Sequence, residues 1–184
     1  LPRLLVMAAL LLPWCAFAHN YVRGQPGAPV TINDRGEMRL DQGNISYHPW
    51  NSRQLAGKVR VVQYIAGRTS AKDKNSMLIT AVKDAAIPAA LFQPTTIVNT
   101  DDVIPGTGYF VRGKIEKNQK RYPWAQFIID SNGLARSRWQ LKAASSTIVV
   151  LDRQGRVRWA KDGALTPAEV SQVISLVEKL ITEE

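Results

Sequence analysis

Hydrophobic and polar positions along this chain alternate in a way that is typical of strands separated by helices. Short runs rich in β-branched residues predict strands, and apolar positions spaced three and four residues apart predict amphipathic helices between them. The predicted strands are 59–65, 95–98, 126–129, 147–151 and 157–159. The predicted helices are 69–86, with Met77, Leu78, Ala81 and Val82 on its apolar face, and 108–119, which closes before Pro123.

The end of the chain carries the clearest helix signal. Thr166 is predicted as the N-cap, Pro167 occupies the first helical position, and Glu169 completes a capping box. The apolar face that follows is Val170, Val173, Ile174, Val177 and Ile181. Just before it, Asp152 to Gly155 is a predicted hairpin turn between the last two strands.

Residues 19–58 differ from the rest of the chain because proline and glycine interrupt them repeatedly. They are predicted to form an irregular, loop-rich N-terminal extension with short extended pieces, and Asn33 to Gly36 is the predicted turn between two of these pieces. The whole order predicts an α/β fold, in which a mixed sheet has helices on both faces.

The first eighteen residues have the pattern of a cleaved signal peptide. Arg3 precedes an apolar run, Leu4 to Leu12, and Ala16-Phe17-Ala18 forms an A-x-A cleavage signal before His19. The run is short for a membrane span, so no stable anchor is expected after cleavage. A lipoprotein would use Cys15, whose preceding residues Pro13 and Trp14 are poor for such processing. We therefore expect a periplasmic protein, with 19–184 as a single domain.

Composition narrows the chemistry open to such a protein. Cys15 is the only cysteine, so the chain after cleavage would have no thiol for disulfide exchange or peroxide reduction. The formal net charge of +9 permits an anionic partner. No long basic run, zinc-finger spacing or helix-turn-helix pattern accompanies this charge, and export makes DNA an unnatural partner, so no nucleic acid is expected.

Residues 57–72, GKVRVVQYIAGRTSAK, resemble the first strand and active-site turn of exported thioredoxin-like proteins. Thr69 and Lys72 stand where such proteins carry their two cysteines, and Ser146 stands where they carry a proline before a strand. The resemblance, which is strongest to the peroxiredoxin-like branch, implies a thioredoxin-like fold without its redox chemistry. A cis bond before serine would be costly, so the Ser145–Ser146 bond is expected to be trans.

Four segments resemble the YtfJ family of small exported bacterial proteins over essentially the whole chain after residue 18. They are the stretch around 57–72, TTIVNTDD at 95–102, YPWAQF at 122–127 and KDGALT at 161–166. The resemblance implies a periplasmic thioredoxin-like protein of unknown biochemical function. Members of the family have been labelled transcriptional regulators, which the signal peptide argues against.

The turn after the first regular strand is the first candidate site. Arg68, Thr69, Ser70 and Lys72 lie where a strand should pass into a helix, and amide donors at a helix N-terminus attract anions. The simpler interpretation is a helix cap in which Ser70, with Asp73 three residues later, imitates a capping box.

A second candidate is Asp101 with Asp102, at the end of the strand 95–98, where ligands gather in open α/β sheets. Adjacent carboxylates suit a hard cation or acid–base chemistry, but aspartate also favours turns. His19 is the third candidate, because a free α-amine and its imidazole chelate copper, with His48 as the other histidine. The competing interpretation is a frayed terminus.

Two classes of function remain open from the sequence. The first is a non-redox binding or accessory protein that contacts an anionic small molecule or a periplasmic protein and needs no cofactor. The alternative is a non-thiol enzyme that uses Arg68, Thr69 and the Asp101–Asp102 pair, or a copper protein that uses His19. A pocket joining Arg68 to Asp101 would favour the enzyme, and a flat basic surface would favour the binding protein.

Overall fold

The computed structural model describes residues 19–183, which contain seven strands and six helical segments. The strands are β1 (Thr31–Asp41), β2 (Asn44–Asn51), β3 (Arg60–Ala66), β4 (Thr95–Asn99), β5 (Gln126–Asp130), β6 (Ser146–Leu151) and β7 (Val157–Asp162). The helices are α1 (Thr69–Asp73), α2 (Ser76–Asp84), α3 (Gly108–Arg121), α4 (Leu134–Trp139) and α5 (Pro167–Thr182), with a 3₁₀ turn η1 (Ser52–Leu55).

All seven strands belong to one mixed sheet with the order β2-β1-β5-β4-β3-β6-β7. The central strands β3, β4 and β5 are parallel, with Val62 opposite Thr95 and Thr95 opposite Gln126. The outer strands β6 and β1 join this centre in antiparallel fashion. The arrangement confirms the predicted α/β class and the mixed sheet.

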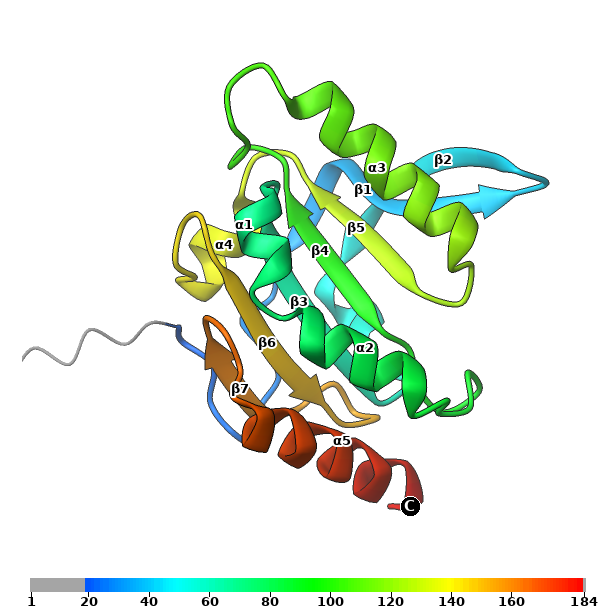
Figure 1. Cartoon of the computed structure of the whole chain (residues 1–184), viewed down its shortest axis with the longest axis vertical. Helices are drawn as coiled ribbons and strands as arrows, with labels where there is room; N and C mark the ends of the chain where they lie inside the picture. The colour runs from blue at the N-terminus through cyan, green and yellow to red at the C-terminus, as the bar shows by residue number, and fades with distance from the viewer. Residues whose placement is uncertain (1–18, 184) are drawn as a thin grey trace, which may run out of the picture.

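Helices α2, α3 and α5 cover one face of this sheet (Figure 1). Alternation along the strands explains the contact, because Val61 and Ile65 of β3 point to this face while Val62 and Tyr64 point to the other. The first part of this core lies beneath α2 and α5 and includes Val59, Val61, Leu78, Val82, Ile148, Val150, Val170, Val173, Val177 and Leu180. The second lies beneath α3 and includes Met38, Ile65, Val98, Ile115 and Ile129.

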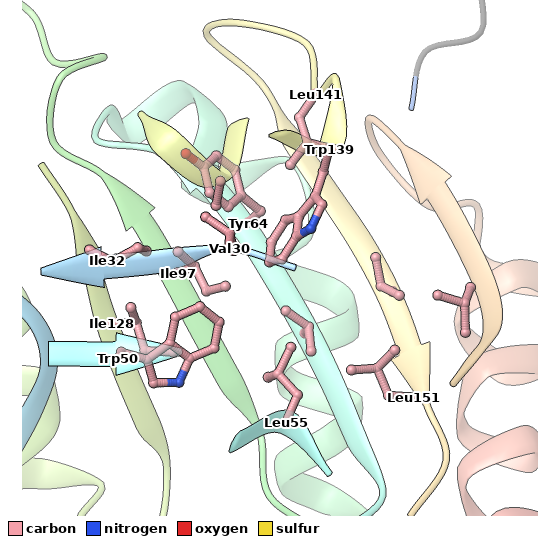
Figure 2. Close-up of a cluster of buried hydrophobic side chains, with 14 residues drawn as sticks. Val30, Ile32, Trp50, Leu55, Tyr64, Ile97, Ile128, Trp139, Leu141 and Leu151 are labelled. Carbon is pink, nitrogen blue, oxygen red and sulfur yellow. The ribbon is translucent and has the colours of Figure 1, made fainter. Parts of the chain in front are cut away.

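The opposite face is covered by α4 and by the segment that precedes β3. In Figure 2 the stretches of β1 and β2 that carry Ile32 and Trp50 cross the central strands, and Trp139 of α4 packs beside them. Ile32, Trp50 and Trp139 are each at most 2% exposed. The loop-rich extension therefore supplies a large part of one core layer, which is a structural role that its composition does not indicate.

The predicted turn at Asn33 to Gly36 is wrong, because these residues form a bulge inside β1. The β1–β2 register shifts between Ile32 and Glu37, and Arg35 and Gly36 have φ values of 60° and 75°. A Cβ at position 36 would collide with the carbonyl oxygen of His48, so glycine is required there. The real turn is Gln42-Gly43, whose two positive φ values suit a two-residue hairpin loop.

The predicted helix 69–86 is divided into α1 and α2 at Lys74 and Asn75. Leu78 and Val82 are buried as expected, whereas Met77 is 52% exposed. Helix α4 was not predicted, since six residues are too few to show a helical period.

The last helix is confirmed with its whole capping box. The side-chain oxygen of Thr166 accepts from the backbone amide of Glu169, and the Glu169 carboxylate accepts from the backbone amide of Thr166. Val170, Val173 and Val177 are buried, while Ile174 and Ile181 are partly buried against the same core. The proposed signal peptide, residues 1–18, lies outside the described residues, and no helix within 19–183 is long and apolar enough to cross a bilayer.

Candidate functional site

The parallel strands β3, β4 and β5 end at one edge of the sheet, which we call the carboxyl edge. The arrowheads of β4 and β5 point to it in Figure 1, and α1, α4 and the start of α3 lie there. Strand β6 begins at the same edge, since its Ser146 lies opposite Ile65 of β3. Ligands of open α/β sheets bind at such an edge, so the predicted site residues on these loops can be placed against one another.

Strand β3 passes into α1 through a tight turn at Gly67. The amide of Gly67 donates to the carbonyl of Asn99 at 3.0 Å, which ties the ends of β3 and β4 together. A Cβ at position 67 would lie 2.6 Å from Cγ1 of Val103, so only glycine allows this approach. Helix α1 then begins at Thr69, as the sequence predicts.

The cap interpretation of Ser70 is wrong, because the N-cap of α1 is Arg68 and no side chain bonds to the cap. The amides of Ala71 and Lys72 donate to the carbonyl oxygen of Arg68 at 3.2 and 3.1 Å. Two of the amides at this helix start are therefore already used within the turn. Thr69, Ser70 and Lys72 are exposed at the carboxyl edge.

Arg68 is brought together with Asp102 and not with Asp101. Its Nε and Nη2 lie 3.0 and 2.8 Å from Oδ1 of Asp102. The second carboxylate oxygen, Oδ2, accepts from the backbone amide of Ala144 in the loop before β6. One carboxylate thus joins three loops of the carboxyl edge.

Asp101 and Asp102 lie in a local turn that separates their side chains. The amide of Asp101 donates to Oδ1 of Asn99 at 3.0 Å, and the amide of Asp102 donates to the Asn99 carbonyl at 3.3 Å. Asp101 is exposed, whereas the side chain of Asp102 is only 14% exposed and is bound to Arg68. Asp101 and Asp102 therefore form a local turn, which is the alternative interpretation of these residues, and their carboxylates do not form a paired site.

Sequence reasoning missed a second set of contacts beside α1. Nζ of Lys74 lies 3.2 Å from Oγ of Ser145, and Nδ2 of Asn75 donates to Oγ of Ser146 at 3.0 Å. The position of Ser146, where the sequence resemblance leads one to expect a proline, could have pointed to this loop. The Ser145–Ser146 bond is trans, as is every other peptide bond in residues 19–183.

The two histidines of the copper hypothesis rest on separate elements with separate partners. Nδ1 of His19 accepts from the amide of Tyr21 at 3.2 Å, and Asn20 is bonded to the carbonyl of Trp139. His48 lies on β2, with Nε2 2.9 Å from Oγ of Ser46. Across residues 19–183, no three His, Cys, Asp or Glu side chains gather in a group that could hold a metal ion.

Charge at the carboxyl edge is mixed. Lys72, Lys74 and Lys142 are exposed there, and none of them forms an ion pair with another residue of the described part of the chain. Asp73 and Asp101 are also exposed. The edge is therefore weakly basic, and Arg68 contributes little free charge because Asp102 neutralises it.

Apolar side chains are the more unusual feature of this edge. Tyr109 and Phe110, in the first turn of α3, are 77% and 68% exposed, and their rings meet edge to face at 5.9 Å between centroids. Ile104 and Leu134, which follow β4 and β5, are exposed as well. We call these four residues, Ile104, Tyr109, Phe110 and Leu134, the apolar rim.

Solved structures that resemble this fold include thiol–disulfide proteins. A proposed protein disulfide isomerase from Bacteroides thetaiotaomicron matches with a TM-score of 0.60 and 14% identity, over 90% of this chain and 94% of that one. A thiol-disulfide isomerase from Corynebacterium glutamicum matches with a TM-score of 0.52 and 16% identity, over 90% and 99%. These likenesses establish a thioredoxin-like fold.

Sequence relatives cover nearly the entire chain. The uncharacterized protein YtfJ of Escherichia coli (strain K12) is 59% identical over 181 residues, which is 98% of each chain. An uncharacterized protein of Haemophilus influenzae is 36% identical over 177 residues, or 96% of each. The family described as "Bacterial protein of unknown function (YtfJ_HI0045)" matches residues 21–180. The chain therefore belongs to the YtfJ family, and it has a thioredoxin-like fold without a pair of cysteines.

Proposed function

We propose that this protein is an exported, non-redox binding protein that holds a partner protein noncovalently at its carboxyl edge. Thr69 and Lys72 occupy the positions at which thioredoxin-like enzymes carry cysteines, and Cys15 lies in the proposed signal peptide. Without a sulfur nucleophile, the edge offers hydrogen-bond donors, cations and apolar surface, which suit binding.

The apolar rim carries this proposal. Exposed aromatic side chains are enriched where proteins bind one another, because each buries a large area on contact. Tyr109 and Phe110 are more than two-thirds exposed, although they lie on a helix whose inner face is buried. They lie in the first turn of α3, at the edge where the parallel strands end.

The loops at the carboxyl edge are held together by hydrogen bonds and an ion pair, which also supports binding. The Asp102 carboxylate holds Arg68 and the loop at Ala144, so three loops keep their positions before a partner arrives. Preorganisation lowers the entropy cost of association. An anionic group on the partner would meet Lys72, since Arg68 is already paired.

Photocrosslinking in cells tests the proposal directly. A photoreactive phenylalanine analogue placed at Phe110 should give discrete crosslinked species in periplasmic extract. The same analogue at Trp124, which is 52% exposed but lies before β5 at the opposite edge, is the matched control. Tyr109→Ala should weaken the crosslinks from position 110 while leaving the fold intact. Equal patterns from both sites would reject the carboxyl edge as the binding surface.

Export is tested by intact mass. Protein taken from the periplasm should begin at His19, because Ala16 and Ala18 satisfy the small-residue requirement for cleavage. Protein that retains residues 1–18, or that carries lipid on Cys15, would contradict this assignment.

A further inference from the structure

An apolar cavity of about 320 Å³ lies on the face of the sheet opposite α2 and α5. Val62 of β3 with Val149 and Leu151 of β6 line it from the sheet, and Leu55 and Trp139 line it from η1 and α4. Leu55, Trp139 and Leu151 are labelled in Figure 2, where they come from three different elements. The volume is within the range of small-molecule sites, and the lining is mostly apolar.

The N-terminal extension forms the rest of the cavity wall and is firmly attached. Residues 25–29 and Tyr21 line the cavity. The amide of Gly24 donates to the carbonyl of Val157 at 2.7 Å, and the amide of Val157 donates to the carbonyl of Gln25 at 2.8 Å. The indole nitrogen of Trp139 donates to the carbonyl of Ala28 at 2.7 Å. These bonds make the cavity a built feature of the fold.

Only one charged residue lines this cavity, and it is a cation. Arg53 lies in η1, is exposed, and forms no ion pair with any residue between 19 and 183. Because Arg53 is exposed and also lines the cavity, this residue lies where the cavity opens to solvent. The cavity therefore combines an apolar interior with a free positive charge at its mouth, and its lining includes no carboxylate.

We propose that this cavity binds a single-chain amphiphile, with the hydrocarbon chain inside and a carboxylate head group paired with Arg53. The apolar lining stabilises the chain by removing it from water, and the guanidinium favours a planar carboxylate over an uncharged head group. The inference is independent of the proposed function, because the cavity is lined by none of the four residues of the apolar rim and by neither Arg68, Lys72 nor Asp102.

Decanoate, below its micellar concentration, is a suitable probe for NMR titration. The methyl signals of Val62, Val149 and Leu151 should shift together and saturate. The methyl signals of Val61, Ile148 and Val150 lie in the same strands but face α2 and α5, and they should move little. No saturable shift at the first three residues, or equal shifts on both faces, overturns the proposal.

Two variants distinguish the contribution of the hydrocarbon chain of the ligand from that of its head group. Ala28→Leu fills part of the cavity with a larger side chain and keeps the backbone carbonyl that accepts from Trp139. This variant should therefore abolish the binding of both decanoate and 1-decanol. Arg53→Ala should lower the affinity for decanoate about fivefold, which is the effect expected from the loss of one surface ion pair. The affinity for 1-decanol should stay unchanged. Arg121→Ala, an exposed cation at the end of α3, is the matched control and should change neither. Equal binding of decanoate to the Arg53→Ala variant and the wild type overturns the role of the head group.

Discussion

Arg68 and Asp102 form an ion pair, with 2.8 Å between Nη2 and Oδ1, at the carboxyl edge where β3 passes into α1. The pair is intramolecular, so Asp102 occupies the guanidinium that an external anion would need. The Arg68 side chain is 34% exposed, and a pair in that setting contributes about 1 kcal/mol or less. The contact is therefore strong enough to compete with a weak ligand but not strong enough to exclude a good one.

The anion hypothesis for Arg68 and Lys72 stays a prediction, and the structure gives it a sharper form. Phosphate at low ionic strength should shift the amide signals of Thr69 and Ser70 only slightly in the wild type. Asp102→Asn removes the competing charge and should increase the apparent affinity about fivefold. Arg68→Ala should abolish the shifts in both backgrounds.

Lys142→Ala is the matched control for that titration, because Lys142 is an exposed cation of the neighbouring loop without an ion pair among residues 19–183. If Asp102→Asn and the wild type respond alike to phosphate, Arg68 takes no part in holding an anion, and the turn serves only the fold.

A cysteine graft tests whether the carboxyl edge is a former redox site. The chain from His19 onward should not reduce insulin, because it has no thiol. Thr69→Cys with Lys72→Cys places two thiols three residues apart in the first turn of α1. We expect the double variant to form an intramolecular disulfide and to catalyse insulin reduction by dithiothreitol.

The single variant Thr69→Cys is the control for this graft, since it has a thiol but no partner for exchange. Turbidity of reduced insulin measures the activity, and mass shift after thiol alkylation measures the disulfide. A double variant that stays reduced in air would contradict the equivalence of this turn with a Cys-x-x-Cys motif.

Asn75 explains why the sequence predicted one helix where two exist. Its Nδ2 donates to Ser146 and to the carbonyl of Gly163, and its Oδ1 accepts from the amide of Leu165. The chain turns at Asn75, where φ is −120° and ψ is 27°, so that this side chain reaches β6 and the loop before α5. A helical period in sequence cannot show such long-range hydrogen bonds.

Asn75→Ala should therefore be among the most destabilising single changes outside the apolar core. The residue is 1% exposed, and its loss leaves the buried amide of Leu165 without an acceptor. We expect the free energy of unfolding to fall by about 3 kcal/mol in urea denaturation. Asn132→Ala, at an exposed asparagine of the loop after β5, should change it little.

Predictions from the sequence succeeded where local signals and burial agree. Strands β3 to β6 are buried runs of β-branched residues, and α5 carries its own cap and apolar face, so their patterns needed no tertiary information. The predictions failed where contacts between residues far apart in the sequence determine the local structure. Asn33 to Gly36 have the composition of a turn, yet pairing of Gly36 and Glu37 with β5 extends the strand through them.

The candidate site shows the same limit. Spacing alone placed Arg68 and the two aspartates at one edge, which is correct, but it could not say which carboxylate Arg68 would meet. The turn set by Asn99 decides this, since it exposes Asp101 and directs Asp102 toward Arg68. The apolar rim was missed because single exposed residues such as Tyr109 have no pattern in sequence.

The cap of α5 predicts a pH dependence of stability. The pKa of Glu169 is lowered from 4.5, first by its hydrogen bond with Lys161 and then by the backbone amide of Thr166. A carboxyl with a lower pKa in the folded state stabilises the fold above the unfolded pKa, and this contribution is lost as the pH falls through the folded value. The contribution is therefore fully present at pH 7 and is lost progressively as the pH falls below 4.5. Glu169→Gln keeps an oxygen for the Thr166 amide but has no charge, so it should be less stable than the wild type at pH 7. The difference in unfolding midpoint should shrink steadily between pH 5 and pH 3.

Glu178→Gln is the matched control, because Glu178 is an exposed glutamate of the same helix without an ion pair in residues 19–183. A difference in unfolding midpoint between Glu169→Gln and the wild type that persists unchanged at pH 3 would show that the charge of Glu169 does not stabilise this cap.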